Sequence, residues 1–102
     1  MMSVREYLAL YLDKKKINKN DLVKKINRVE KELGESRTVY ANVTNYLNGY
    51  HPFRCKVLAK WEVALGLEEG SLFNYVSPPL SSDGVKEFKD YLKKLREIRR
   101  KL

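Results

Sequence analysis

Apolar residues recur three and four positions apart through the first three quarters of the chain, which is the spacing of amphipathic helices. Five such stripes follow one another, over 4–12, 22–33, 39–47, 57–65 and 69–75. No segment shows the strict alternation of apolar and polar residues that is typical of a strand hairpin. The pattern therefore predicts an all-α fold with five helices in this part of the chain.

Polar and helix-breaking residues between the stripes predict where the helices begin and end. Asn18 is expected to be the N-cap of the second helix, and Gly34 to end it. Ser36 or Thr38 is expected to cap the third helix. Pro52 suits the first turn of the fourth helix, because proline at that position loses no helical hydrogen bond.

The last quarter of the chain is separated from the rest by a segment rich in proline and serine. Residues 77–83 include two prolines and cannot continue a helix, so they are interpreted as a linker between a domain at 1–76 and a helix at 84–102. The apolar stripe of this helix must be covered. We expect it to form a dimer, and the alternatives are packing on its own domain, a membrane surface or another protein. The expected dimer seam is Val85, Phe88, Leu92, Leu95 and Leu102.

The composition of the chain favours some classes of function and excludes others. The 102 residues carry 21 basic and 13 acidic side chains, a net charge of +8, which favours a polyanionic partner and above all nucleic acid. A single cysteine, Cys55, excludes an internal disulfide and indicates a reducing compartment, expected to be the cytoplasm with its nucleoid. No apolar run is long enough to cross a membrane. No catalytic set, phosphate-cradling loop or metal-ligand spacing is present, so the sequence predicts neither an enzyme nor a cofactor or metal.

The third helix has the composition of a DNA-recognition helix although its surroundings are almost neutral. Residues 36–79 carry a net charge of +1, against +4 for residues 80–102. Val39, Val43 and Leu47 mark the buried side of the helix at 38–48. The other side offers short polar groups and no carboxylate, and such groups suit base edges in the major groove. The candidate base-reading residues are Tyr40, Ala41, Asn42, Thr44 and Asn45.

A second set of residues is expected to hold DNA phosphates. The start of the second helix presents free backbone N–H groups, which favour an anion. Basic and hydroxyl side chains before and after the third helix lie where they can contact the backbone of the duplex. The candidate phosphate-binding residues are Lys19, Asn20, Arg37, Thr38, Tyr50, Arg54 and Lys56.

Four pieces of the sequence resemble phage repressors of the Cro/CI (XRE-like) helix-turn-helix family. Residues 17–23, 43–49, 58–67 and 69–73 are similar to parts of the second, third, fourth and fifth helices of that family. The resemblance implies a five-helix lambda-repressor-like domain that binds double-stranded DNA as a homodimer on a palindromic operator, here followed by a C-terminal amphipathic helix.

The sequence departs from the family pattern in two ways. Lys19 stands where the family usually has Gln, and Val23 where it has Ala. Residues 28–37 are an insertion of about ten residues between the two helices of the motif, which either extends the second helix or lengthens the turn.

These observations predict a sequence-specific transcriptional regulator that reads DNA through residues 38–48. Repression would follow from blocking polymerase, and activation is equally compatible with the residues. The alternative is a protein-interaction module of helix-turn-helix fold, antitoxin-like or anti-repressor, that does not read bases, because a fold does not by itself establish a function.

Overall fold

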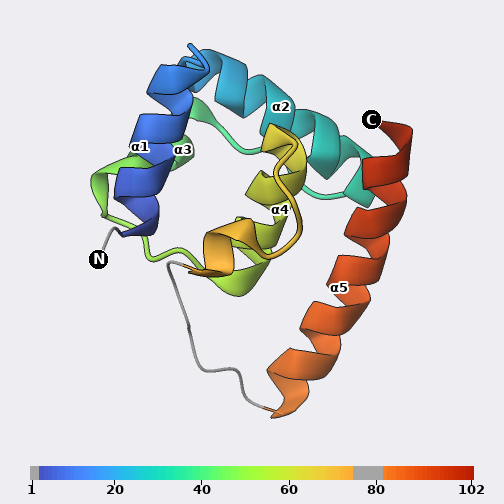
Figure 1. Ribbon diagram of the computed structural model, residues 1–102. Helices are drawn as coiled ribbons and strands as arrows, with labels where there is room; N and C mark the ends of the chain where they lie inside the picture. The colour runs from blue at the N-terminus through green and yellow to red at the C-terminus, as the bar shows by residue number, and fades with distance from the viewer. Residues whose placement is uncertain (1–2, 75–81) are drawn as a thin grey trace.

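Helices account for the regular structure throughout the described residues. The computed structural model describes residues 3–74 and 82–102, with side chains for 3–72 and 86–102. No strand occurs in these ranges, and this confirms the predicted all-α class (Figure 1). In chain order the elements are α1 (Val4–Lys14), α2 (Lys19–Leu33), α3 (Tyr40–Asn48), α4 (Cys55–Leu65), the 3-10 helix η1 (Ser71–Asn74) and α5 (Ser82–Lys101).

The ends of α2 follow the sequence prediction. Asn18 accepts a hydrogen bond from the backbone N–H of Asp21 at 2.8 Å, and the Asp21 carboxylate accepts one from the backbone N–H of Asn18 at 3.4 Å. This reciprocal capping box satisfies two N–H groups that a helix start would otherwise leave unpaired. At the other end Gly34 adopts a left-handed φ of 71°, which glycine tolerates without a steric cost.

The start of α3 differs from the prediction. Neither Ser36 nor Thr38 caps the helix, because its N-cap is Val39, which makes no side-chain hydrogen bond there. Val39 is also 55% exposed rather than buried. Helix α4 starts at Cys55, beyond Pro52, and the predicted fifth helix is the short 3-10 turn η1.

A first core joins α1, α2, α3, α4 and η1. Trp61 lies at its centre, 1% exposed, with its ring in edge-to-face contact with Tyr46 at 5.7 Å and Phe53 at 5.2 Å. The predicted stripes meet here, since each of the five elements contributes at least one buried apolar side chain. Its buried members are Val4, Leu8, Leu12, Leu22, Ile26, Val43, Leu58, Trp61, Leu65 and Leu72.

A buried carboxylate fixes η1 against α4. Glu62 is fully buried and accepts hydrogen bonds from the backbone N–H groups of Gly70, at 3.0 Å, and Leu72, at 2.7 Å. Burial raises the pKa of Glu62 although these two bonds oppose the shift. The carboxylate thus satisfies two backbone donors that would otherwise be buried without a partner.

A second core places α5 against α2 and α4 of the same chain. In Figure 1, α5 runs along one side of the molecule and α1 along the other, with α4 between them. The packing residues come from all three helices, so α5 belongs to the same compact unit as the preceding domain. The buried members are Val29, Ala59, Val63, Tyr91, Leu95 and Ile98.

This packing corrects one part of the expected dimer seam. Leu95 is 2% exposed in the second core, so it has no surface left for a second copy of the chain. Phe88 and Leu92 pack against the same core and are half-buried, whereas Leu102 is 54% exposed. The side chain of Val85 lies outside the described residues. Two positions of the predicted linker, 82 and 83, belong to α5. The other linker positions, 77–81, lie outside the described residues.

Residues 28–37 include both the last part of α2 and the start of the non-helical segment that leads to α3. Helix α2 continues through them to Leu33, and the chain then runs without helix to the start of α3. In the part of the chain that the structure describes, no helix combines the length and the apolar character needed to cross a bilayer.

Candidate nucleic-acid interface

Helix α3 turns a polar face outward. Val43 is fully buried against the first core, which fixes the rotation of the helix. Ala41, Asn45 and Asn48 follow one another at four and three residues and share the opposite face. Ala41 and Asn48 are exposed, and Asn45 is half-buried. Asn48, which the sequence analysis treated only as part of the helix end, therefore joins the candidate base-reading residues.

A hollow of about 650 Å³ is lined by residues of α1, of the start of α2 and of α3. Tyr40, 48% exposed, borders it on the α3 side, and Lys19 and Asn20 border it on the α2 side. The structure thus brings two predicted phosphate-binding residues and one predicted base-reading residue to the same surface depression.

Arg5 of α1 is part of this interface and was missed by sequence reasoning. It lines the same hollow, and its guanidinium lies against the backbone of Gly49 at the end of α3. A Cβ atom at position 49 would lie 1.7 Å from Nη1 of Arg5. No local pattern signals this contact, since Arg5 and Gly49 are 44 positions apart and only the packing of α1 on α3 brings them together.

A smaller hollow of about 270 Å³ lies on the other side of α3. Asn42 of α3 and Arg54, which precedes α4, line it. His51 lines it too, and its Nε2 is 3.4 Å from Nδ2 of Asn45. Among the described residues no cluster of His, Cys, Asp and Glu is suited to a metal ion, so His51 takes part here as a neighbour of Asn45.

Three of the predicted contact residues are directed elsewhere. Thr38 donates both its backbone N–H, at 2.8 Å, and its hydroxyl, at 2.5 Å, to Glu30, so neither donor is left for a phosphate. The hydroxyl oxygen of Thr44 is completely buried, without a hydrogen-bond partner among the described residues, and cannot meet a base edge. Lys56 forms an ion pair with Glu87 at 3.6 Å and lies 5.5 Å from the ring centre of Tyr91, so it connects α4 to α5.

The remaining two predicted phosphate-binding residues are exposed and border neither hollow. Arg37 lies in the segment before α3, and Tyr50, 75% exposed, lies just after it. They flank the two ends of α3, and no hydrogen bond or ion pair with another described residue fixes the direction of their side chains.

A buried ionic network sets the position of the α3 start. Glu30 of α2 is 2% exposed and holds Thr38 on one side and Lys60 of α4, at 2.8 Å, on the other. Lys60 also contacts Glu35 at 3.2 Å, and the hydroxyl of Tyr91 donates to Glu35 at 3.4 Å. The chain between α2 and α3 is therefore fixed by side chains from α2, α4 and α5.

The network shifts the proton affinity of its members. Burial alone would lower the pKa of Lys60, but the hydrogen bond and charge of Glu30, assisted by Glu35, outweigh it and raise the pKa. Burial, together with the charge of Glu35, raises the pKa of Tyr91. Sequence reasoning missed this network, although a signal was present: Glu30 is four positions after Ile26 and directly follows Val29, both fully buried residues of the apolar stripe.

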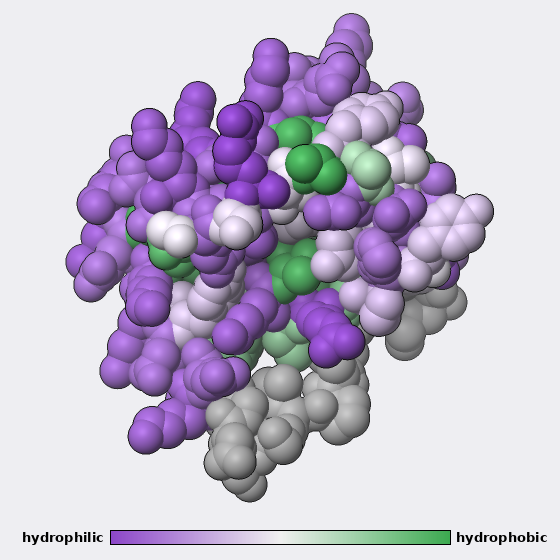
Figure 2. Space-filling view, turned by 180° about the vertical axis from the view of Figure 1, so that it is seen from behind, coloured by the Kyte–Doolittle hydropathy of each residue, from purple (hydrophilic) through white to green (hydrophobic). Residues whose placement is uncertain are grey.

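The surface around α3 combines basic side chains with exposed apolar and aromatic ones, among them Val39, Tyr40 and Tyr50. Figure 2, which shows the molecule from behind, presents mostly hydrophilic residues with a few apolar side chains between them. Residues 36–61 contain four basic residues and no acidic one. The chain matches no protein-family model, no curated protein and no solved structure.

Proposed function

We propose that the chain is a sequence-specific DNA-binding regulator of the helix-turn-helix type that reads the major groove with α3. The observation that carries this proposal is the outward face of Ala41, Asn45 and Asn48, which belongs to a stretch, residues 36–61, without a carboxylate. The hollows on either side of α3 are lined by Arg5, Lys19 and Arg54, with Asp13 as the one acidic residue in their lining. A helix that presents short polar groups and no negative charge matches what a recognition helix requires.

Each side chain of this face has a chemical role in the proposed complex. Asn45 and Asn48 on the face, and Asn42 at its edge, can form paired hydrogen bonds with adenine, and the methyl group of Ala41 can meet the methyl group of thymine. Arg5 and Lys19 on one side, and Arg54 on the other, are placed to contact phosphates and so set the register of α3.

Regulation follows from occupancy of the site. A chain bound over a promoter excludes polymerase and acts as a repressor. A homodimer on a palindromic operator remains part of the proposal, with its contact outside the buried face of α5, and the symmetry of the bound sequence tests it.

The proposal is tested by selecting bound sequences from random double-stranded DNA. We expect one preferred site, and we expect Asn42→Ala with Asn45→Ala to weaken binding to that site. Each asparagine that pairs with a base should account for a weakening of roughly 5- to 150-fold, about 1–3 kcal/mol. Affinity for a random duplex should change little, because the side chains that bind phosphates are unaltered.

The control is Ser36→Ala, an exposed polar residue outside α3. A selection that yields no preferred sequence, or a double variant that binds the selected site as tightly as the wild type, would contradict base reading by α3. Either result would favour the protein-interaction module instead.

A further inference from the structure

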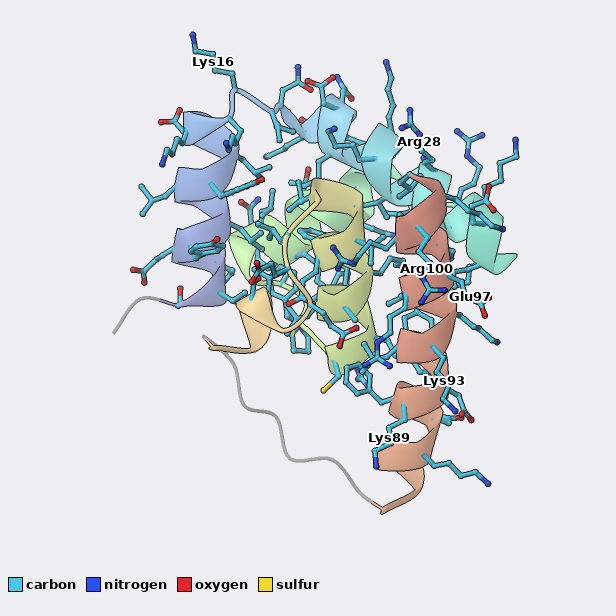
Figure 3. All side chains as sticks on the ribbon, turned by 45° about the vertical axis from the view of Figure 1, so that its right-hand side comes forward. Lys16, Arg28, Lys89, Lys93, Glu97 and Arg100 are labelled. Carbon is cyan, nitrogen blue, oxygen red and sulfur yellow. The ribbon has the colours of Figure 1, made fainter. Side chains whose placement is uncertain are left out.

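The outward face of α5 carries a row of basic side chains, Lys86, Lys89, Lys93 and Arg100, which we call the α5 stripe. All four are exposed. At 3.6 residues per turn they fall within about 60° of arc and extend over roughly 21 Å of helix. Figure 3 shows Lys89, Lys93 and Arg100 projecting from the outer side of α5, with Glu97 beside them.

The α5 stripe is not neutralised within the chain. The ion pairs that α5 makes involve Glu87 with Lys56, Arg96 with Glu69, and Lys101 with Glu32. Within 3–72 and 86–102, no carboxylate forms an ion pair with a member of the stripe. Lys89 and Lys93 are also four positions apart, where like charges repel on a helix. Asp90 and Glu97 lie beside the row, four positions after Lys86 and Lys93, and offset part of its charge. The four basic side chains outnumber these two carboxylates, so the stripe keeps an excess of positive charge.

The burial of the other side of α5 decides between polyanionic partners. A helix that binds a lipid surface inserts its apolar face into the headgroup region. Here Tyr91, Leu95 and Ile98 are buried against α2 and α4, so α5 can meet a partner with its charges alone. Double-stranded DNA carries about one negative charge per 1.7 Å, hence roughly a dozen over the length of the stripe, and it is bound by charge alone when sequence is not read.

The α5 stripe and the α3 face lie on different sides of the molecule. The α3 face opens beside α1, whereas α5 lies across α4 from α1 and turns its stripe away from the core (Figures 1 and 3). We propose that the α5 stripe binds the phosphate backbone of a second duplex segment without reading its sequence, so that one chain can hold two segments. This inference relies on the proposed function for the nature of the ligand and for the first of the two bound segments.

The test compares the full-length chain with Lys89→Gln/Lys93→Gln/Arg100→Gln in binding to a random-sequence duplex over a range of salt concentrations. Each bound phosphate contributes about 0.9 to the slope of log affinity against log salt, so we expect the slope to fall by about 2 to 3 units. In a pull-down, the wild type should carry a labelled duplex onto a bead-bound duplex, and the variant should show little of this capture.

The matched control is Lys14→Gln/Lys15→Gln/Lys16→Gln, which removes the same three charges from the end of α1 and the turn after it, far from α5 (Figure 3). We expect it to change the slope by less than about 1 unit. An equal fall in both variants would show that only net charge matters and would overturn the proposal, as would undiminished duplex capture by the stripe variant. Vesicles of phosphatidylserine provide a further arm, and a loss of binding confined to vesicles would assign the stripe to lipid.

Failure of the α3 proposal gives a different result. If α3 reads no sequence, every variant binds selected and random duplexes with the same affinity. The slope of log affinity against log salt on a random duplex still reports on the α5 stripe in that case. Both triple variants change exposed residues only, and circular dichroism should show wild-type helix content.

Discussion

At the scale of single residues, the positions that fix the interface are charged side chains inside the protein. Glu30 receives donors from Thr38 and Lys60 and so fixes the segment from which α3 starts. Removing one partner from such a buried pair leaves a charge without compensation, which is costly. The interface therefore depends on residues that do not touch the proposed ligand.

The same network predicts how stability depends on alkaline pH. The pKa values of Lys60 and Tyr91 are raised above their ordinary values of 10.5 and 10.0, so the folded chain holds these protons more tightly than the unfolded chain. The stability that these two protonated groups contribute is complete below about pH 10. It is lost as the pH rises above the ordinary pKa values and through the raised pKa values of the folded chain. Urea unfolding between about pH 8 and 11 should show the loss.

Tyr91→Phe separates the two contributions, because it removes the phenol and leaves Lys60 paired with Glu30. The variant should lose less stability than the wild type over the same rise in pH. Equal losses in wild type and variant would mean that Tyr91 does not contribute, and stability that increases with pH would contradict the direction of both shifts.

At the scale of elements, the sequence predicted helices more reliably than it predicted how one helix is joined to the next. The stripes of α1, α2 and α4 and the stop at Gly34 follow from local spacing and local hydrogen bonds, and the structure confirms them. The prediction that Thr38 caps α3 was wrong. Thr38 is a residue type that often caps helices, but its hydroxyl donates a hydrogen bond to Glu30 of another helix. Local propensity cannot reveal a competing partner from elsewhere in the fold.

The candidate interface was predictable to the same extent. Tyr40, Asn42 and Arg54, which were selected by residue type and position, line the hollows beside α3, while their contacts with DNA stay a prediction. Arg5 was not predictable, because its place depends on how α1 packs on α3. The buried hydroxyl of Thr44 likewise depends on the rotation of α3, which the core sets.

A glycine pair tests the contact between α1 and the end of α3. Gly49 and Gly34 both end helices with a left-handed φ, of 87° and 71°, so either change to Ala should destabilise the fold by about 1 kcal/mol through backbone strain. Only at Gly49 would the new Cβ displace the guanidinium of Arg5.

We therefore expect Gly49→Ala to lower the salt slope of DNA binding by about 0.9, the contribution of one bound phosphate, and Gly34→Ala to leave it unchanged. The measurement is duplex affinity by fluorescence anisotropy at several salt concentrations, with stability followed separately by urea unfolding. Identical slopes for both variants would exclude Arg5 from the residues that bind phosphate.

At the scale of the whole molecule, two cores share α2 and α4. The first core holds α1, α3 and η1 on these helices, and the second holds α5. Since α2 and α4 contribute to both, the loss of α5 packing should weaken the entire described structure. The C-terminal helix is thus part of the scaffold that presents α3, and its charged side remains free for a partner.

Leu95→Ala tests this coupling. Leu95 is almost fully buried in the second core, and removing its side chain should cost about 2–5 kcal/mol, enough to lower the melting temperature by roughly 10 °C or more in a chain of this size. Trp61, the one tryptophan of the sequence, lies in the first core, so its fluorescence reports on a region that Leu95 does not contact. Both tryptophan fluorescence and far-ultraviolet circular dichroism should show a single transition at the same lowered temperature. If α5 were instead a separate element that pairs with a second copy, Leu95→Ala would reduce the molecular mass in sedimentation and leave the tryptophan transition at the wild-type temperature.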